Sequence, residues 1–116
     1  MRRTPIRFRS DKRTAQQDYR RKLAEQWQGE RCWIGLVGVC EGYGWCWHEL
    51  VGAGVGGSRV DPRNLCWSCG SCNTTLERLD DRYEQGLKVR SSDAELGEGG
   101  LVPRAAHRLA LAGRWQ

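Results

Sequence analysis

The chain lacks any apolar run long enough to cross a membrane, and its first residues lack the apolar middle region of a signal peptide. It is also poor in core material, because hydrophobic residues of every kind make up only 39% of its 116 residues and glycine occupies 15 positions. Domains with so small a core often depend on a metal ion or on disulfides. We therefore expect one small cytoplasmic domain that stays away from membranes and needs such a cross-link.

The six cysteines are the material for that cross-link. Without export, a reducing cytosol favours zinc thiolates, although an even number of cysteines leaves disulfides open. A Cys-x2-Cys pair on a tight turn and an upstream Cys-x7-Cys pair can place four sulfurs around one closed, structural zinc site. We expect Cys46 and Cys66 to be free thiols, although Cys40 with Cys46 is an alternative first pair. The expected zinc ligands are Cys32, Cys40, Cys69 and Cys72.

The charge is moderately basic, with 19 Lys and Arg against 14 Asp and Glu, and it is concentrated near the amino terminus. Residues 1–31 hold ten basic side chains and four acidic ones. A solvated tail is one interpretation, and an arm that contacts nucleic-acid phosphates is the interpretation that we favour. The residues expected to make these contacts are Arg2, Arg3, Arg7, Arg9, Lys12 and Arg13.

Periodicity and turn residues predict the local structure. Tyr19, Leu23 and Trp27 recur every four residues and predict the packed face of a first helix. The glycine-rich loop at 52–58 resembles a phosphate-binding loop only superficially, because no Lys-Ser or Lys-Thr follows it. The expected elements are a helix over 11–29, strands over 43–51 and 65–68, a helix over 73–85, a polar linker over 91–100 and a short helix over 103–112.

The central block also carries a set of short motifs at regular distances. They are His48-Glu49, Gly56-Gly57, Asn64-Leu65 and Cys69-x2-Cys72-Asn73. As a set, over about residues 12–91, they resemble the HNH endonuclease family in its zinc-stapled bacteriophage form. The resemblance implies a small α+β domain of the ββα-metal fold, with a structural zinc site and flanking helices. It divides the chain into a basic arm at 1–10, a zinc domain at 11–90 and a linker with a carboxy-terminal extension at 91–116.

The resemblance also implies a site for phosphodiester cleavage. His48 and Asn73 are its implied ligands for a catalytic divalent cation (Mg²⁺, Mn²⁺ or Ni²⁺), which would stabilise charge on the phosphate and the leaving oxygen. Asn64 is implied to tether the loop between the strands and to orient the catalytic side chain. Glu49 occupies the position of the general base that deprotonates the attacking water.

Glu49 is the main departure from the family pattern, which has histidine as the base. A carboxylate is weaker than imidazole as a base by about two pKa units unless burial raises its pKa. Glu49 is then a slow base, or exchanges roles with His48, or belongs to an inactive site. Adjacent strand residues point to opposite faces, which opposes a simple exchange.

Three functions therefore remain open. The leading one is a metal-dependent DNA endonuclease of low sequence specificity, in the host cytoplasm if a phage encodes it. The others are an inactive zinc-stabilised nucleic-acid-binding module and an accessory protein that contacts phage DNA-packaging proteins. Simple structural roles also remain open for the site residues: a buried, hydrogen-bonded His48, a surface Glu49, a turn-forming Asn64 and an Asn73 that caps a helix. We expect His107 to be a surface histidine, and Trp45, Trp47 and Trp67 to pack in the core.

Overall fold

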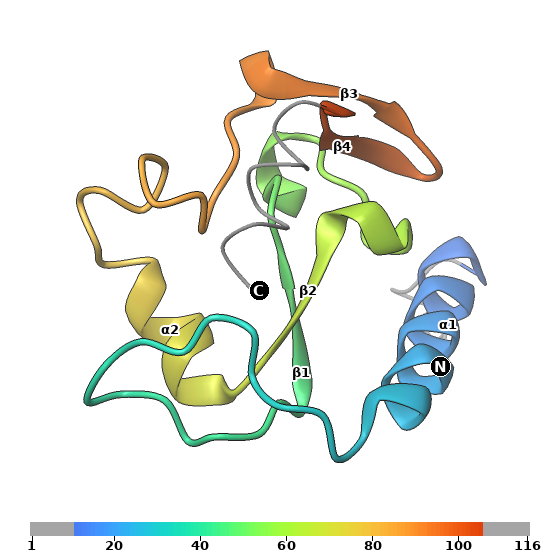
Figure 1. Ribbon diagram of the computed structural model, residues 1–116. Coiled ribbons are helices and arrows are strands. Elements are labelled where there is room, and N and C mark those ends of the chain that lie inside the picture. Colours follow the sequence, from blue (N-terminus) through green and yellow to red (C-terminus); the bar gives the residue numbers. More distant parts are fainter. Residues whose placement is uncertain (1–10, 106–116) are drawn as a thin grey trace, which may run out of the picture.

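The computed structural model describes residues 11–105, which form a small α+β domain with two α-helices and two small antiparallel sheets (Figure 1). No helix in this range is long and apolar enough to cross a membrane. The basic arm and all but the first residues of the expected terminal helix lie outside the range. The elements are α1 (Asp11–Trp27), β1 (Cys46–Glu49), η1 (Ala53–Val55), η2 (Pro62–Asn64), β2 (Leu65–Ser68), α2 (Gly70–Leu76), η3 (Ser91–Asp93), β3 (Ala94–Gly97) and β4 (Gly100–Pro103).

The β1–β2 hairpin runs through the middle of the molecule, with α1 on one side and α2 on the other (Figure 1). Its antiparallel register pairs Trp47 with Trp67 and His48 with Cys66. Because strand side chains alternate, the two tryptophans share one face, and the histidine and cysteine share the other. The hairpin therefore separates an aromatic cluster under α1 from an apolar cluster that includes residues of α2 and all four buried cysteines.

The first helix ends at Trp27, just before Gly29, which has a φ of +93°. Of the three residues predicted to form its packed face, Leu23 and Trp27 are partly buried against the aromatic cluster, whereas Tyr19 is 43% exposed. The ring of Trp27 lies 4.7 Å from that of Trp33, and the rings of Trp47 and Trp67 lie 4.8 Å apart. The two strand indoles also donate hydrogen bonds to backbone carbonyls, so their polar groups are satisfied on burial. The expectation of core packing is confirmed for Trp47 and Trp67 but is wrong for Trp45, whose side chain is 62% exposed.

The expectation of a long helix over 73–85 is wrong. The helix α2 begins at Gly70, where the Cys69 sulfur accepts a hydrogen bond from the Cys72 N–H, and it ends at Leu76. The chain then runs through successive turns, which bring Leu87 and Val89 into the core. Val89 N–H donates to the Leu50 carbonyl at 2.8 Å. Tertiary burial therefore outweighs the helix propensity of this segment.

The expectation of a polar linker over 91–100 is also wrong, because this segment forms η3 and most of the β3–β4 hairpin. Backbone hydrogen bonds join Leu101 to Gly56 and Ser58 on the loop after β1. The carboxylate of Asp61 adds a contact by accepting from the Glu98 N–H. The side chain of Arg63 lowers the pKa of Asp61 to about 2, so this carboxylate is ionised at neutral pH. The side-chain pattern did not predict this hairpin, because backbone groups, which every residue type has, join it to the loop after β1.

Candidate metal centre

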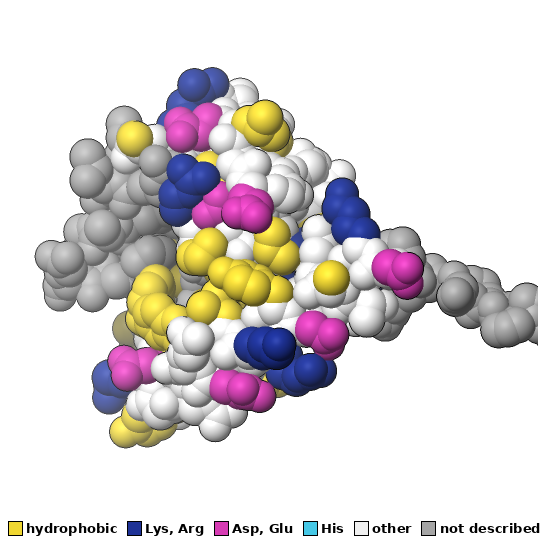
Figure 2. Space-filling view, turned by 90° about the vertical axis from the view of Figure 1, so that its right-hand side faces the viewer, with side chains coloured by type: hydrophobic (Ala, Val, Ile, Leu, Met, Phe, Trp, Pro, Cys, Tyr) yellow, Lys and Arg dark blue, Asp and Glu magenta, His cyan; other side chains and the backbone are white. Residues whose placement is uncertain are grey.

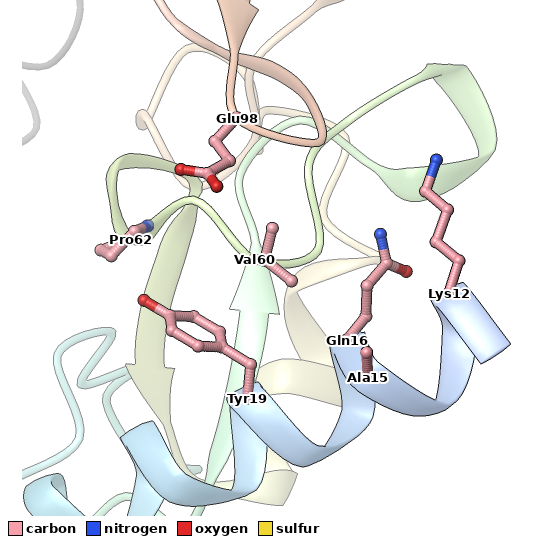
Figure 3. A pocket seen from close by; sticks show the side chains of 7 residues that line it. All are labelled: Lys12, Ala15, Gln16, Tyr19, Val60, Pro62 and Glu98. Carbon is pink, nitrogen blue, oxygen red and sulfur yellow. The ribbon is translucent and has the colours of Figure 1, made fainter.

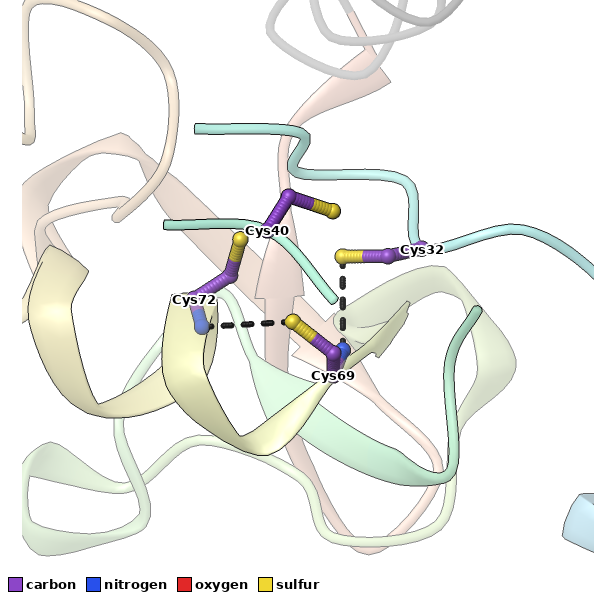
Figure 4. A group of neighbouring side chains, drawn as sticks. All are labelled: Cys32, Cys40, Cys69 and Cys72. Atoms are coloured by element: carbon purple, nitrogen blue, oxygen red, sulfur yellow. Dashed lines mark hydrogen bonds between the residues drawn. The ribbon is translucent and has the colours of Figure 1, made fainter. Parts of the chain in front are cut away.

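Four cysteine sulfurs lie within 4.8 Å of one another, in the set that the sequence predicts (Figure 4). Two come from the loop between α1 and β1, and two come from the junction of β2 and α2. Within residues 11–105, this is the only group of three or more His, Cys, Asp or Glu side chains placed to hold a metal ion. The four can hold an ion such as zinc, which prefers a tetrahedral set of thiolates. They are Cys32, Cys40, Cys69 and Cys72.

Each of these sulfurs accepts at least one hydrogen bond from a backbone N–H group. The donors are Leu36, Glu41, Gly42, Cys69 and Cys72, at 3.3 or 3.4 Å. Donors that point at a sulfur favour its thiolate form. Sequence reasoning missed these donors, although the glycines of the 32–42 loop were a signal. Gly35 and Gly42 have φ of +60° and +103°, a region that favours glycine and turns the loop around the sulfurs.

The thiols respond differently to this environment. Burial raises the pKa of Cys72, and neighbouring sulfurs raise it further. For Cys32, burial is opposed by the N–H groups of Gly35, Cys69 and Ile34, which together lower its pKa. Four close thiols cannot all ionise by themselves, because each new thiolate repels the next. A divalent cation removes that repulsion, so the cluster is suited to a bound metal.

The other two cysteines, Cys46 and Cys66, lie outside this set and, as expected, form no disulfide. Cys46 lies on β1, where its sulfur contacts the Ser68 carbonyl at 3.3 Å and accepts from the Asn73 amide at 3.6 Å. Cys66 is fully buried on β2. The alternative pairing of Cys40 with Cys46 is therefore not the one that the fold forms.

His48 is buried, with 3% of its surface exposed, and its Nε2 lies 2.6 Å from the Leu87 carbonyl. A carbonyl can only accept, so Nε2 carries the proton. Burial lowers the pKa of His48, which keeps the ring neutral. Asn73, the other implied ligand, is the fourth residue of α2 rather than its cap, and its amide points to the Cys46 sulfur. Both implied ligands thus have partners inside the protein.

Glu49 lies on the opposite side of the β1–β2 sheet from His48. Its carboxylate is 2.6 Å from the guanidinium of Arg20 on α1, and both side chains are about one-fifth exposed. The same guanidinium donates to the Arg59 carbonyl at 3.0 Å. The residue at the expected base position therefore joins α1 to the sheet.

Asn64 is fully buried and ties the loop after β1 to the start of β2. Its Oδ1 accepts from Val51 N–H at 2.7 Å, and its Nδ2 donates to the carbonyls of Val51 and Ser58 at 3.0 and 2.8 Å. Every hydrogen bond goes to the backbone, so this side chain sets the path of the loop. Asn64 therefore tethers the loop between the strands, in the way that the resemblance implies. Its role in orienting a catalytic side chain stays a prediction.

Of the expected phosphate contacts, only Lys12 and Arg13 lie within the described residues, both exposed on α1. Lys12 lines a hollow of about 320 Å³ between α1 and the loops facing it, together with Tyr19, Val60 and Glu98 (Figure 3). Figure 2 shows this side of the molecule, where hydrophobic side chains gather in the middle and charges of both signs surround them. This face is mixed in charge rather than uniformly basic.

The neutral, buried His48 predicts a pH-dependent stability. The pKa of His48 in the folded protein lies below the ordinary 6.5. As the pH falls below 6.5, the histidine is therefore protonated in the unfolded chain before it is protonated in the folded one. The unfolding free energy should therefore fall as the pH drops below about 6.5. In His48→Gln, whose amide can still donate to Leu87, that part of the slope should disappear. Urea unfolding at saturating zinc, between about pH 7.5 and 5.5, measures both proteins; identical slopes would contradict a buried neutral histidine.

Comparison with known proteins adds no relative: no protein-family model, no curated protein and no solved structure matches the chain. Two features of the chain itself bear on its function. One is the four-cysteine cluster, and the other is that His48 and Glu49 already have partners within the protein.

Proposed function

We propose that the chain is a zinc-stabilised ββα module of the HNH kind that binds nucleic acid without cutting it. The order β1, β2, α2 supports the fold, and the four-cysteine cluster supports zinc as its staple. A set of four thiolates fills the tetrahedral positions of zinc and leaves none open for substrate, as is typical of structural sites. Binding of this kind contributes about 10 kcal/mol or more to folding.

The main observation against cleavage is the ion pair between Glu49 and Arg20. To activate water near His48, the Glu49 carboxylate would have to leave a partner at 2.6 Å and act from the opposite face of the sheet. His48 itself is too buried to touch a phosphate. The expected base is therefore already paired, and the expected histidine ligand is buried.

Nucleic-acid binding is supported by the charge of the chain. Its formal net charge is +5, and basic residues are concentrated in its first 31 residues. Cations that neutralise backbone phosphates release counterions, so affinity of this kind falls steeply with salt. The proposal assigns this role to the basic arm and to Lys12 and Arg13 at the start of α1.

Cleavage of phosphodiester bonds is the second candidate, because two observations favour it. The Leu87 carbonyl holds the His48 ring with the proton on Nε2, which leaves Nδ1 unprotonated. This arrangement orients a histidine as a metal ligand or as a base. Asn64 holds the loop as the endonuclease family requires. The side chain of His48 is thus of a type that binds divalent cations. A cation could reach it only if the buried histidine became accessible.

One experiment separates the two candidates. We expect the protein to bind duplex DNA in low salt, yet leave supercoiled plasmid intact in Mg²⁺, Mn²⁺ or Ni²⁺, with His48→Ala and Glu49→Ala giving the same result. Nicking by the wild type that both variants lose would establish the endonuclease instead. Nicking that is equal in all three proteins would indicate a contaminant, and failure to bind DNA would refute the binding function.

A further inference from the structure

A cleft of about 390 Å³ lies beside the end of β1, outside every site discussed above. One wall is the loop at Gly52 and Gly54, and the other is the segment that follows the turns after α2. Lys88 and Arg90 line it together with the hydroxyl side chains of Ser91 and Ser92. The cleft therefore combines two cations with hydrogen-bond donors in one concave surface.

The side chain of Lys88 is largely buried, at 15% exposure, and is held in place by Glu77. Its Nζ lies 2.8 Å from the Glu77 carboxylate. A β-carbon placed on Gly52 would lie 3.5 Å from the same Nζ, an ordinary van der Waals contact, so the ammonium lies beside the Gly52 wall of the cleft. Lys88 is thus a positioned charge whose strength Glu77 moderates.

Arg90 differs from Lys88 in that no acidic side chain among residues 11–105 neutralises it. Its guanidinium stacks on the ring of Tyr83, 4.1 Å from the centroid. Stacking fixes the plane of the guanidinium and leaves its N–H edge available. Arg104 adds a third cation at the rim, where it contacts the Ser92 carbonyl at 3.5 Å. Glu77 pairs with Lys88 and Asp93 follows Ser92 in the chain, so the three cations exceed these two acids by one charge.

We propose that this cleft binds one phosphate of the nucleic-acid backbone, a subsite that deepens the proposed function and rests on it. A planar guanidinium matches the oxygens of a phosphate, a lysine adds a point charge, and serine hydroxyls complete the donor set. Lys88 follows Leu87, whose carbonyl holds His48, so the phosphate would lie next to the buried histidine without touching it.

Fluorescence anisotropy of a labelled DNA duplex, measured over a range of salt concentrations, tests this subsite with three variants. Arg90→Gln should weaken binding and reduce the slope of log K against log salt by about 0.9, the loss of one phosphate contact. Glu77→Gln should tighten binding, because it releases Lys88 from its only ion pair among the described residues. Arg78→Gln removes the same charge from an exposed residue outside the cleft and should leave the slope unchanged.

Equal losses in Arg90→Gln and Arg78→Gln would overturn the subsite while leaving the proposed function intact. Failure of the wild type to bind DNA would reject the proposed function and the subsite together. Inorganic phosphate, compared with chloride at equal ionic strength, separates the two sources of the ligand. Thermal stabilisation by phosphate that Arg90→Gln abolishes, with no change in DNA affinity, would assign the cleft to free phosphate and overturn a backbone contact.

Discussion

Removal of zinc is expected to unfold the whole domain rather than only the loop at 32–42. Chelation by EDTA at neutral pH, with reductant present, should abolish the near-ultraviolet signal of the tryptophan cluster. The reason is magnitude: a structural zinc contributes about 10 kcal/mol or more, while the net stability of a domain is about 5–15 kcal/mol. Circular dichroism before and after chelation, and again after zinc is restored, measures the effect.

The packing explains why the loss would spread. The indole of Trp33, next to Cys32, packs against both apolar clusters, and the backbone N–H of Trp33 donates to the Trp67 carbonyl at 3.0 Å. Cys69 links the end of β2 to α2, both as an expected ligand and as the helix cap. Loss of the metal therefore releases contacts of the aromatic cluster as well as those of α2.

Two cysteine variants provide the matched comparison. Cys69→Ser should give a chain that holds no zinc and shows no cooperative unfolding. Cys46→Ala, which removes a sulfur outside the cluster, should keep one zinc per chain and a cooperative transition. A chelated wild type that kept its urea midpoint would show that the apolar clusters suffice without metal.

Asn64→Asp is expected to be the most damaging isosteric change in the fold. The carboxylate can still accept from Val51 N–H, but it cannot donate to the carbonyls of Val51 and Ser58. It also places a charge at a fully buried position, against two carbonyl oxygens. Because each buried polar group left without a partner costs about 1–3 kcal/mol, we expect a loss of about 3 kcal/mol or more.

Urea unfolding at saturating zinc measures this loss, and Asn73→Asp is its control. Within the described range 11–105, the Asn73 amide makes one long contact, at 3.6 Å, with the Cys46 sulfur, and this side chain is partly exposed. We expect that change to cost about 1 kcal/mol or less. Similar losses in the two variants would mean that Asn64 does not carry the loop between β1 and β2.

Local patterns in the sequence were enough to predict α1, β2 and the four cysteines of the metal centre, but not the bounds of α2. The four-residue period that ends at Trp27 predicted α1, and the 65–68 strand was predicted with its observed bounds. The spacing of the cysteines predicted which four come together, because a Cys-x2-Cys turn and an upstream pair need little more than a hairpin to meet.

Contacts between distant parts of the chain could not be predicted in this way. Alternation along β1 implied that Glu49 and His48 face apart, but the partner of Glu49 depends on how α1 lies across the sheet, 29 residues away in the chain. The early end of α2 follows from burial of Leu87 and Val89, and the β3–β4 hairpin follows from backbone bonds to the loop after β1. These contacts also form the cleft at Lys88 and Arg90, for which no motif exists.

X-ray absorption at the zinc edge of the purified protein identifies the atoms that bind the metal. We expect one zinc per chain with four sulfur neighbours at about 2.3 Å and no nitrogen neighbour. A nitrogen neighbour at about 2.0 Å would contradict this expectation. It would show that a histidine binds the metal, and it would favour a metal site with His48 as a ligand.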